Sequence, residues 1–396
     1  MTEIEAGDNW AGSYLHIPFC AARCAYCDFN TYAGLADLAE PYARALVREI
    51  DLVASSAPAP IHVPTVFFGG GTPSLMPLPR LAEILAALRR GFVLADDCEI
   101  TLEANPGTVD AEYLDGLAAL GINRLSFGVQ SAQPGELALL GRIHSWDEAV
   151  EAVTLAKRAG FDRRSGINVD LIFGVPDQSM AAWQDTLERA LALEPEHISL
   201  YCLTLEPGTR LNAQVQRGEV PLPDDDLAAD MYLYTEERLA GTFEHYEISN
   251  WCRPGRACRH NLVYWRNRPY LGFGAGAHGS WGGTRYSNVL RPRRYIGRLE
   301  NTAPGEFPFS PAIVARERIG RAMSMGETMM LGLRLLEEGV GFSAFAARFG
   351  ADLRDVYPRE IAEAEGRGLL EVCTDRVRLT PQGRLLGNKV FALFLP

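Results

Sequence analysis

The chain has 396 residues, 47% of them hydrophobic, which is enough for one large domain and a smaller one. Its formal net charge of −12 disfavours unspecific attraction to nucleic acid or to anionic membranes. Residues 1–8 lack the features of a signal peptide, and no window offers eighteen uninterrupted apolar residues. We therefore expect a cytoplasmic protein whose cysteines stay reduced.

From residue 12 onward, short β-rich runs alternate with amphipathic helical stretches, as is typical of parallel βα units. The predicted strands cover residues 14–17, 65–68, 99–103, 124–128, 168–173 and 198–203. The predicted helices cover residues 38–53, 78–91, 111–120, 146–159, 181–193 and 227–240. Right-handed crossovers would roll these units into an α/β fold, a partial (β/α)6 TIM-like barrel with its chemistry at the carboxyl ends of the strands.

Three thiols follow the first predicted strand, in the run Cys20-Ala-Ala-Arg-Cys24-Ala-Tyr-Cys27. Three cysteines on one loop can hold three irons of a [4Fe–4S] cluster and leave the fourth iron open to a ligand. A zinc ribbon would need a second C-x2-C pair, and a disulfide framework suits small secreted chains. The spacing therefore predicts an iron–sulfur cluster with one vacant coordination site.

Polar residues follow the next strands in the same way. The turn Gly69-Gly-Gly-Thr-Pro-Ser74 lets backbone approach a ligand closely, because glycine has no Cβ. Glu103, Gln130, Arg142 and Asp170 lie near successive strand ends and suit an amine, a carboxylate and a ribose. Each of them alone is also compatible with a solvated surface position. As a set on one rim they predict a small-molecule site.

A second motif is the string His260-Asn-Leu-Val-Tyr-Trp265. An imidazole can coordinate haem iron axially, and the tyrosine and tryptophan rings offer flat apolar faces to a macrocycle. The string alone is equally compatible with a packed aromatic corner around a hydrogen-bonded histidine. Cys252 and Cys258 precede it with a spacing that suits no common zinc pattern.

The stretch 291–311 contains the proline and glycine breakers of a linker. Beyond it we predict helices over residues 312–338, 342–349 and 356–366, a hairpin over 369–374 and 376–380, and a last helix from Pro381. The predicted domains are thus a tail (1–11), a barrel with an extension that carries the histidine motif (12–290), a linker (291–311) and a small, mainly helical, winged-helix-like domain (312–396). Residues 312–396 carry 12 basic and 11 acidic side chains, so they form no basic stripe for DNA.

The chain resembles the radical S-adenosylmethionine (SAM) superfamily, and within it the group of oxygen-independent coproporphyrinogen III dehydrogenase and the HemW haem chaperones. Besides the cysteine run, the resemblance is carried by the motifs Tyr14-Leu-His-Ile-Pro-Phe19, Gly-Gly-Gly-Thr-Pro-Ser, Phe127-Gly-Val-Gln-Ser131, Gly141-Arg-Ile-His144, Asn168-Val-Asp-Leu-Ile-Phe-Gly-Val-Pro176 and Glu206-Pro-Gly-Thr209.

This resemblance implies that Cys20, Cys24 and Cys27 bind the cluster and that SAM chelates the open iron through its amine and carboxylate. Reductive cleavage of SAM would then give methionine and a 5′-deoxyadenosyl radical. The implied SAM contacts are Tyr14, Tyr26, Gly70, Gly71, Thr72, Glu103, Gln130, Arg142, Asp170 and Thr204. The implied haem contacts are His260, Asn261, Tyr264 and Trp265.

The residue after Asp28 separates the two functions within this group. The dehydrogenase pattern is C-x3-C-x2-C-x-C, whereas Phe29 stands in this chain at the fourth cysteine position. The resemblance therefore favours a haem chaperone with an iron–sulfur cluster and SAM that passes haem to acceptor haemoproteins. The alternatives are the dehydrogenase, which oxidatively decarboxylates coproporphyrinogen III, and a radical SAM enzyme with another substrate.

The partners expected from this resemblance are haem and acceptor haemoproteins, respiratory enzymes among them, and no nucleic acid. A membrane-bound acceptor would require peripheral docking. The sequence leaves docking and homodimer formation open, together with a role of the cluster in dimerisation, redox gating or haem transfer.

Overall fold

The computed structural model describes residues 9–396 and divides into two compact units. The barrel unit comprises Met1–Glu237 and Pro269–Glu317, and the C-terminal unit comprises Arg238–Arg268 and Arg318–Pro396. The predictions for residues 1–8, namely most of the tail and the expected lack of signal-peptide features, concern residues outside the described part of the chain. Residues 9–11 belong to the fold, since Ala11 N donates to His62 O at 3.0 Å.

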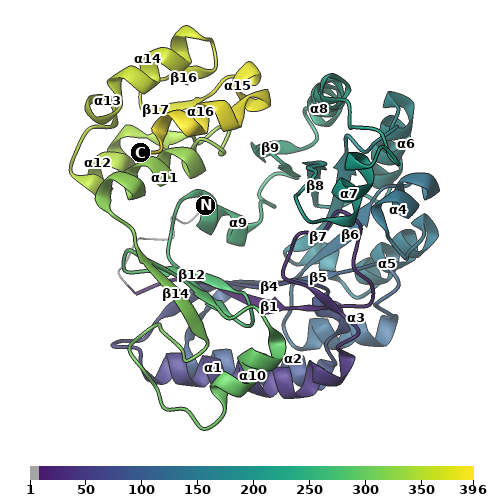
Figure 1. Ribbon diagram of the computed structural model, residues 1–396, viewed down its shortest axis with the longest axis vertical. Helices are drawn as coiled ribbons and strands as arrows, with labels where there is room; N and C mark the ends of the chain where they lie inside the picture. Colours follow the sequence, from purple (N-terminus) through teal and green to yellow (C-terminus); the bar gives the residue numbers. More distant parts are fainter. Residues whose placement is uncertain (1–8) are drawn as a thin grey trace. The chain divides into compact units, whose positions relative to one another are not determined.

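A parallel sheet forms the centre of the barrel unit (Figure 1). Its strands are β1 (Gly12–Ile17), β4 (His62–Gly70), β5 (Val93–Ala104), β6 (Arg124–Gln130), β7 (Gly166–Phe173) and β8 (His197–Cys202), paired in this order. Because these strands are covered by helices, they are long runs of buried residues, as expected for a parallel sheet. All six predicted strands are confirmed.

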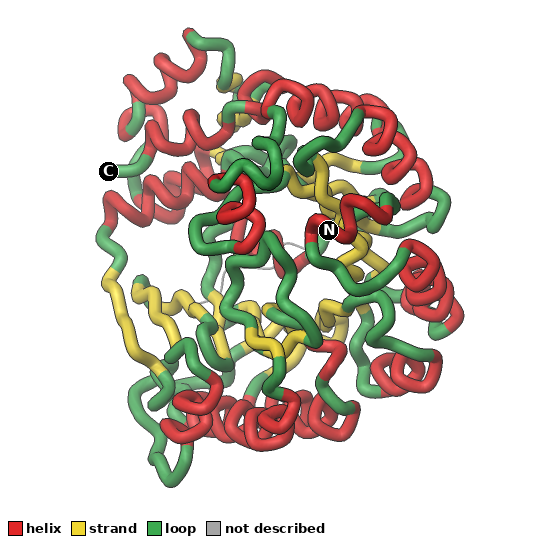
Figure 2. The backbone as a smooth tube through the Cα atoms, turned by 45° about the vertical axis from the view of Figure 1, so that its right-hand side comes forward, coloured by secondary structure: helices red, strands yellow, loops and turns green. Residues whose placement is uncertain are grey.

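The helices of the barrel unit lie outside the strands, as Figure 2 shows. They are α1 (Ala39–Ser55), α2 (Leu78–Gly91), α3 (Ala111–Ala119), α4 (Pro134–Leu140), α5 (Trp146–Arg158), α6 (Met180–Leu191), α7 (Arg210–Gln216) and α8 (Asp225–Leu239). Local signals set several of their starts: Ser145 and Glu148 form a capping box for α5, and Asp110 caps α3. The partial α/β barrel predicted from the sequence is confirmed.

The sheet continues beyond β1 into strands that the sequence analysis did not predict. β11 (Tyr270–Phe273) pairs parallel with β1, and β12 (His278–Trp281) and β13 (Thr284–Asn288) follow antiparallel, with β14 (Ile313–Arg318) at the edge. The prediction of helix for residues 313–318 is therefore wrong. Most of this strand is exposed, so it offered no strong apolar alternation to mark it as a strand.

A buried carboxylate, Glu49 on α1, fixes the returning chain to the barrel. It accepts hydrogen bonds from Gly274 N (2.8 Å), Asn288 Nδ2 (2.8 Å), Tyr295 OH (2.5 Å) and Ser310 Oγ (2.6 Å). Helix α10 (Pro292–Leu299) carries Tyr295 and lies beside α1 (Figure 1). Residues 291–311 are therefore not the irregular linker that was predicted. Pro292 begins a helix there, because the first turn of a helix tolerates proline.

The C-terminal unit combines two separate segments of the chain. Its first segment contains the strands β9 (Glu244–Glu247) and β10 (Asn250–Cys252) and the helix α9 (Arg259–Trp265). Its second contains α11 (Arg321–Gly332), β15 (Val340–Gly341), α12 (Phe342–Phe349), α13 (Leu353–Val356), α14 (Pro358–Gly366), β16 (Leu370–Val372), β17 (Arg376–Leu379), α15 (Pro381–Leu385) and α16 (Gly387–Phe394). The order of helices followed by a hairpin agrees with the predicted winged-helix-like module.

One apolar core holds the second segment of the C-terminal unit, with Phe345, Phe391 and Phe394 among its buried members. The first segment joins it through backbone pairing, because Leu336 N donates to Tyr246 O at 3.1 Å and Ile248 packs against the core. The histidine motif therefore groups with the C-terminal elements, whereas the sequence analysis had assigned it to the barrel (12–290). Periodicity could not reveal this grouping, since it depends on contacts between residues far apart in the chain.

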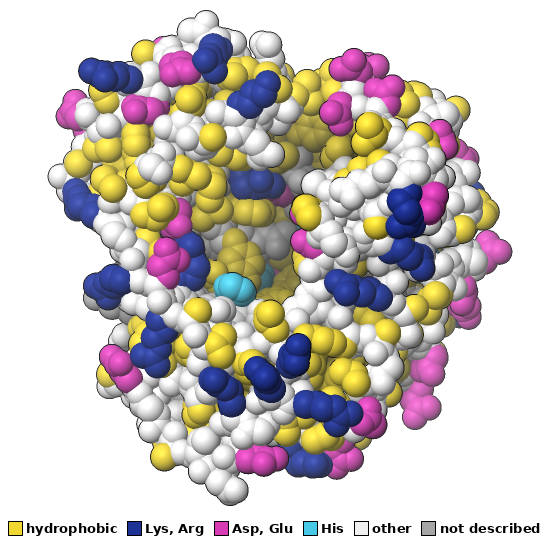
Figure 3. Space-filling view, viewed as in Figure 1, with side chains coloured by type: hydrophobic (Ala, Val, Ile, Leu, Met, Phe, Trp, Pro, Cys, Tyr) yellow, Lys and Arg dark blue, Asp and Glu magenta, His cyan; other side chains and the backbone are white. Residues whose placement is uncertain are grey.

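Basic and acidic side chains are interspersed on the surface of the C-terminal elements, and the face in Figure 3 shows no continuous basic stripe there. No helix among residues 9–396 is long and apolar enough to cross a membrane.

Candidate functional site

The three cysteines lie on a loop at the carboxyl end of β1. The short strands β2 (Phe19–Cys20) and β3 (Tyr32–Ala33) pair and so close this loop at its base. Its middle is held by two backbone hydrogen bonds, from Ala25 N to Leu140 O and from Leu211 N to Ala25 O, both at 2.8 Å. We call residues 20–33 the cysteine loop. Its anchoring to α4 and α7 fixes where the thiols point.

Each of the three thiols has a polar neighbour. Thr72 Oγ1 donates to Cys20 Sγ at 3.7 Å, and Arg142 Nη1 donates to Cys24 Sγ at 3.2 Å. Cys27 Sγ lies 3.9 Å from Thr31 Oγ1. Burial raises the pKa of Cys20 and Cys27, and hydrogen bonds with Thr72 and Thr31 partly offset this rise.

The donor chemistry of this loop fits an iron–sulfur cluster. Within residues 9–396, no three His, Cys, Asp or Glu side chains converge closely enough to bind a single metal ion. A four-iron cluster does not need such convergence, because each thiolate binds a different iron. All eight cysteines are free thiols, so none of the three is used in a disulfide.

The glycine turn after β4 packs against the cysteine loop through its backbone. Gly71 N donates to Ile17 O at 2.8 Å, and Thr72 N donates to Phe19 O at 2.7 Å. A Cβ on Gly71 would lie 2.6 Å from the oxygen of Phe19, and a Cβ on Gly70 would lie 2.4 Å from the His16 ring. Both positions therefore require glycine, and the turn supports the loop that carries Cys20.

Asn105 connects the two thiol donors, Thr72 and Arg142. Its Nδ2 donates to Thr72 Oγ1 at 2.8 Å, and its Oδ1 accepts from Arg142 Nη2. Arg142 also donates to Gly128 O at 2.7 Å. The sequence analysis did not select Asn105, although it lies in the run from Glu103 to Pro106. The only available signal was its position at a strand end.

A pocket on this rim is lined by residues that include Cys24, Thr72, Asn105, Arg142 and His144. The structure thus brings together the cysteine loop, the glycine turn and Arg142 around one opening. Gln130 follows from β6 with a φ of 70°, in the left-handed region, where the β6–β7 register shifts. Such backbone strain is typical of binding sites.

Two carboxylates, on β5 and on β7 with β6 between them, lie deeper in the barrel. Glu103 Oε2 accepts from Gly70 N at 3.0 Å, and Asp170 accepts from Ser126 Oγ at 3.0 Å and from Asn168 Nδ2 at 2.7 Å. Burial, and next the charge of Asp170, raise the pKa of Glu103 to about 8. Burial also raises the pKa of Asp170. A cationic group of a ligand would find two acidic partners there.

Tyr14 is tied to the cysteine loop through His16. His16 Nε2 lies 3.0 Å from Asn30 O, and since a carbonyl only accepts, Nε2 carries the hydrogen. Burial lowers the pKa of His16, so the ring is neutral and its Nδ1 accepts from Tyr14 OH at 2.9 Å. Asn30 in turn donates to Ala275 O and Leu290 O, each at 3.0 Å. The sequence analysis included His16 only as part of the motif Tyr14-Leu-His-Ile-Pro-Phe19 and did not select Asn30.

The other two predicted SAM contacts, Tyr26 and Thr204, differ in their surroundings. Tyr26 packs against the apolar cluster of Leu140 and Leu211, and burial raises its pKa. Thr204 is exposed just after β8. The assignment of SAM contacts to these residues stays a prediction.

The histidine motif lies on α9 in the C-terminal unit. His260 is 1% exposed, and its Nε2 lies 3.0 Å from Tyr264 OH, with the two rings edge to face at 5.0 Å between centroids. The Arg334 guanidinium lies 4.4 Å from the Trp265 ring centre, and Asn261 is half-buried. Cys252 and Cys258 are both buried. In this state the imidazole forms the packed aromatic corner that the string alone also allowed, so binding iron through Nε2 requires the contact to Tyr264 to open.

Comparison with known proteins places this geometry in a family. Residues 14–190 match the family model described as the Radical SAM superfamily, and residues 323–386 match the HemN C-terminal domain. The chain is 41% identical over 388 residues to a protein of Mycobacterium tuberculosis named heme chaperone HemW, covering 97% of this chain and 94% of that protein. It is 37% identical to the HemW of Bacillus subtilis, covering 97% and 98%.

Among solved structures, coproporphyrinogen III oxidase (HemN) from Escherichia coli superimposes with a TM-score of 0.83 at 23% sequence identity. The match covers 98% of this chain and 90% of that one. At this identity the likeness concerns the fold.

Proposed function

We propose, from the premise that this chain belongs to the radical SAM superfamily and to its HemW branch, that it is a haem chaperone which carries a [4Fe–4S] cluster with SAM and delivers haem to acceptor haemoproteins. Similarity to proteins named HemW over nearly the whole chain supports the haem function. The cysteine loop supports the cluster.

The chain's own residues have distinct parts in this proposal. Cys20, Cys24 and Cys27 would hold the cluster, which when bound supplies an iron open to the amine and carboxylate of SAM. Thr72 and Arg142 donate toward two of the sulfurs and so help to fix their positions. Glu103 lies where it can accept from a cationic amine. The half-buried loop limits the access of water to the cluster.

The single observation that favours the chaperone over the dehydrogenase is Phe29. Its side chain is 64% exposed on the cysteine loop, at the position where the dehydrogenase pattern has a fourth cysteine. A phenyl ring cannot ligate iron. A large exposed apolar side chain beside the cluster instead suits contact with an apolar ligand or a partner protein.

For haem, the motif on α9 supplies His260 with Tyr264 and Trp265, and Asn261 lies next to the histidine. We propose that haem binding opens the contact between His260 and Tyr264 and frees Nε2 for iron. Acceptors of the respiratory chain, peripheral membrane docking and a homodimer belong to the same proposal. A cytoplasmic location also belongs to it, since the free thiols suit a reducing compartment.

The test is an anaerobic reconstitution followed by haem titration and product analysis in the same preparation. We expect a Soret shift on haem binding that weakens in His260→Ala and stays unchanged in the control His62→Ala, which alters an exposed histidine of the barrel unit. Tyr264→Phe removes the competing hydroxyl and is expected to keep or strengthen binding. Turnover of coproporphyrinogen III would contradict the chaperone and favour the dehydrogenase. Consumption of a substrate that is not a tetrapyrrole would favour another radical SAM enzyme.

A further inference from the structure

We infer that three arginines at the carboxyl end of α9, namely Arg266, Arg268 and Arg348, form a site for the carboxylate groups of the bound tetrapyrrole. We call them the arginine triad. The inference rests on the proposed haem function and deepens it, because it names the part of the ligand that these residues recognise. All three belong to the C-terminal unit.

The geometry of the chain brings the triad together. Asn267 adopts a φ of 48°, in the left-handed region, and its N donates to Tyr264 O at 2.8 Å. This turn ends α9, and Arg268 N donates back to Val263 O at 2.9 Å. From α12, Arg348 Nη1 donates to Arg266 O at 3.4 Å. The guanidinium group of Arg348, from a distant segment, thus lies at the turn that carries Arg266 and Arg268.

The positive charge of the triad is only partly compensated. Glu338 binds Arg266 through both carboxylate oxygens, the shortest contact being 2.7 Å, and it is also felt by Arg268. The negative charge of Glu327 acts on Arg348. Two carboxylates therefore face three guanidinium groups. Among the residues described, none forms a hydrogen bond or ion pair with the guanidinium of Arg268.

The lowered pKa values of Arg268 and Arg348 are consistent with a site that lacks its anionic ligand. Partial desolvation, and next the neighbouring Arg266, lower the pKa of Arg268. Partial desolvation, and next Arg268, lower the pKa of Arg348. Guanidinium groups that repel one another in this way gain stability when a carboxylate binds between them.

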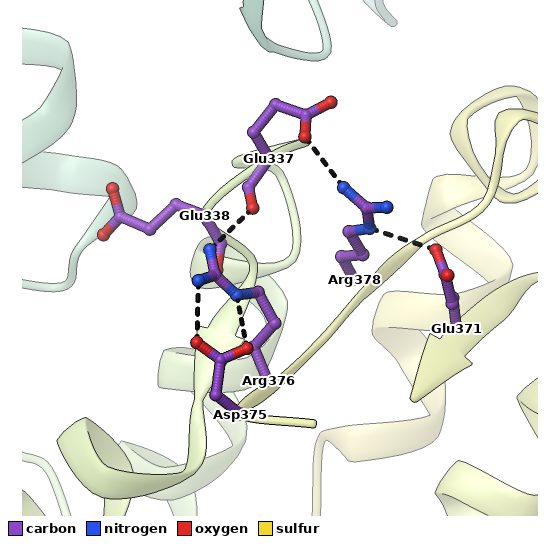
Figure 4. Close-up of polar contacts among 6 residues, drawn as sticks. All are labelled: Glu337, Glu338, Glu371, Asp375, Arg376 and Arg378. Carbon is purple, nitrogen blue, oxygen red and sulfur yellow. Dashed lines mark hydrogen bonds and ion pairs between the residues drawn. The ribbon is translucent and has the colours of Figure 1, made fainter. Parts of the chain in front are cut away.

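Other arginines of the same unit provide a contrast, shown in Figure 4. Arg376 binds both carboxylate oxygens of Asp375, with Nη2 at 2.8 Å from Oδ2. Arg378 binds Glu337 at 2.8 Å and Glu371 at 3.0 Å. These two arginines are fully compensated within the unit, so they serve as matched controls for loss of positive charge.

The position of the triad suits the carboxylates of a porphyrin. Arg266 follows His260 by six residues, or about 9 Å along a helix at 1.5 Å per residue. A macrocycle seated against the motif can therefore reach the triad with carboxylates at its edge. Arginine is suited to this contact because its planar donors match a carboxylate in pairs.

The experiment compares haem with haem dimethyl ester, which has the same ring but no free carboxylates. With the reconstituted full chain, we expect Arg268→Gln/Arg348→Gln to weaken haem binding about tenfold or more, and to leave the weaker binding of the dimethyl ester unchanged. The control Arg376→Gln/Arg378→Gln, which also removes two positive charges, should affect neither ligand. Circular dichroism of each variant checks that the unit is folded.

The outcomes separate this inference from the proposed function. If the native chain binds neither ligand, the haem function itself fails. If the native chain binds haem and its dimethyl ester equally well, or the double variant binds haem as the native chain does, the inference is overturned and the haem function stands.

Discussion

Arg142 on the rim of the barrel donates to the sulfur of Cys24 at 3.2 Å, although 118 residues separate the two in sequence. The same guanidinium holds Gly128 O and Asn105 Oδ1, so its position is fixed from three sides. A charged donor with rigid supports is therefore held at the sulfur of one predicted cluster ligand.

This contact leads to a first prediction. Arg142→Lys keeps the charge but cannot reach the sulfur and both supports at once. We expect lower iron and sulfide content per chain after anaerobic reconstitution, with an unchanged far-ultraviolet spectrum. Arg90→Lys is the control, because Arg90 is an exposed arginine on α2 that pairs with Asp51 on α1 at 3.1 Å. Equal iron content in both variants would show that Arg142 does not act on the cluster.

A second prediction concerns Gly71. In Gly71→Ala the added methyl would lie 2.6 Å from Phe19 O, and backbone cannot yield as a flexible side chain can. We expect the glycine turn to move away from the cysteine loop, with reduced iron content and a lower melting temperature. Gly297→Ala in α10 meets no atom within 4 Å and should be neutral or slightly stabilising. A fully loaded Gly71→Ala protein would contradict the assigned role of the turn.

A third prediction follows from the pKa of Glu103, raised to about 8 in the folded chain. Its unfolded value is about 4.3, so between these values the folded chain holds a proton that the unfolded chain has lost. Stability that is present below about pH 4 is therefore lost progressively as the pH rises to about 8. Urea midpoints of the ligand-free chain at pH 5 and pH 8 should differ more for the native chain than for Glu103→Gln.

The control for this pH dependence is Glu112→Gln, which alters an exposed carboxylate in the first turn of α3. It should retain the native difference between the two midpoints. If Glu103→Gln also retained it, Glu103 would not be the group responsible.

A fourth prediction concerns the buried carboxylate of Glu49. Glu49→Ala removes the shared acceptor of four donors, and we expect a loss of about 3 kcal/mol in the free energy of unfolding. Glu40→Ala on the same helix breaks only an exposed pair with Arg44 and should cost about 0.5 kcal/mol. Urea unfolding of both variants measures the difference, and similar losses would contradict the anchoring role.

The sequence allowed correct prediction of the parallel strands because each is a short β-rich run followed by an amphipathic helix. It also placed the cysteine loop and Arg142 at the same rim, which follows from the common direction of the strands. Strand β11 was missed, since residues 270–273 lie in a run rich in glycine and proline. Residues 313–318 were predicted to be helical because arginine, glutamate and alanine are good helix formers.

The residues that support the site could not be predicted from the sequence for a different reason. Asn105 and Asn30 each bridge segments that are distant in the sequence, and no local pattern marks such a bridge. The grouping of α9 with the C-terminal elements is of the same kind. Polar side chains that act through long-range contacts become visible only when the chain is folded.

The central claim is that Cys20, Cys24 and Cys27 hold a four-iron cluster with one open coordination site. Mössbauer spectroscopy of chain reconstituted anaerobically with iron-57 and sulfide tests it most directly. We predict the quadrupole doublet of a [4Fe–4S] cluster, lost when the three cysteines are changed to serine and kept when the other thiols Cys202 and Cys373 are changed instead. A native chain without that doublet, or a triple variant that retains it, would contradict the account.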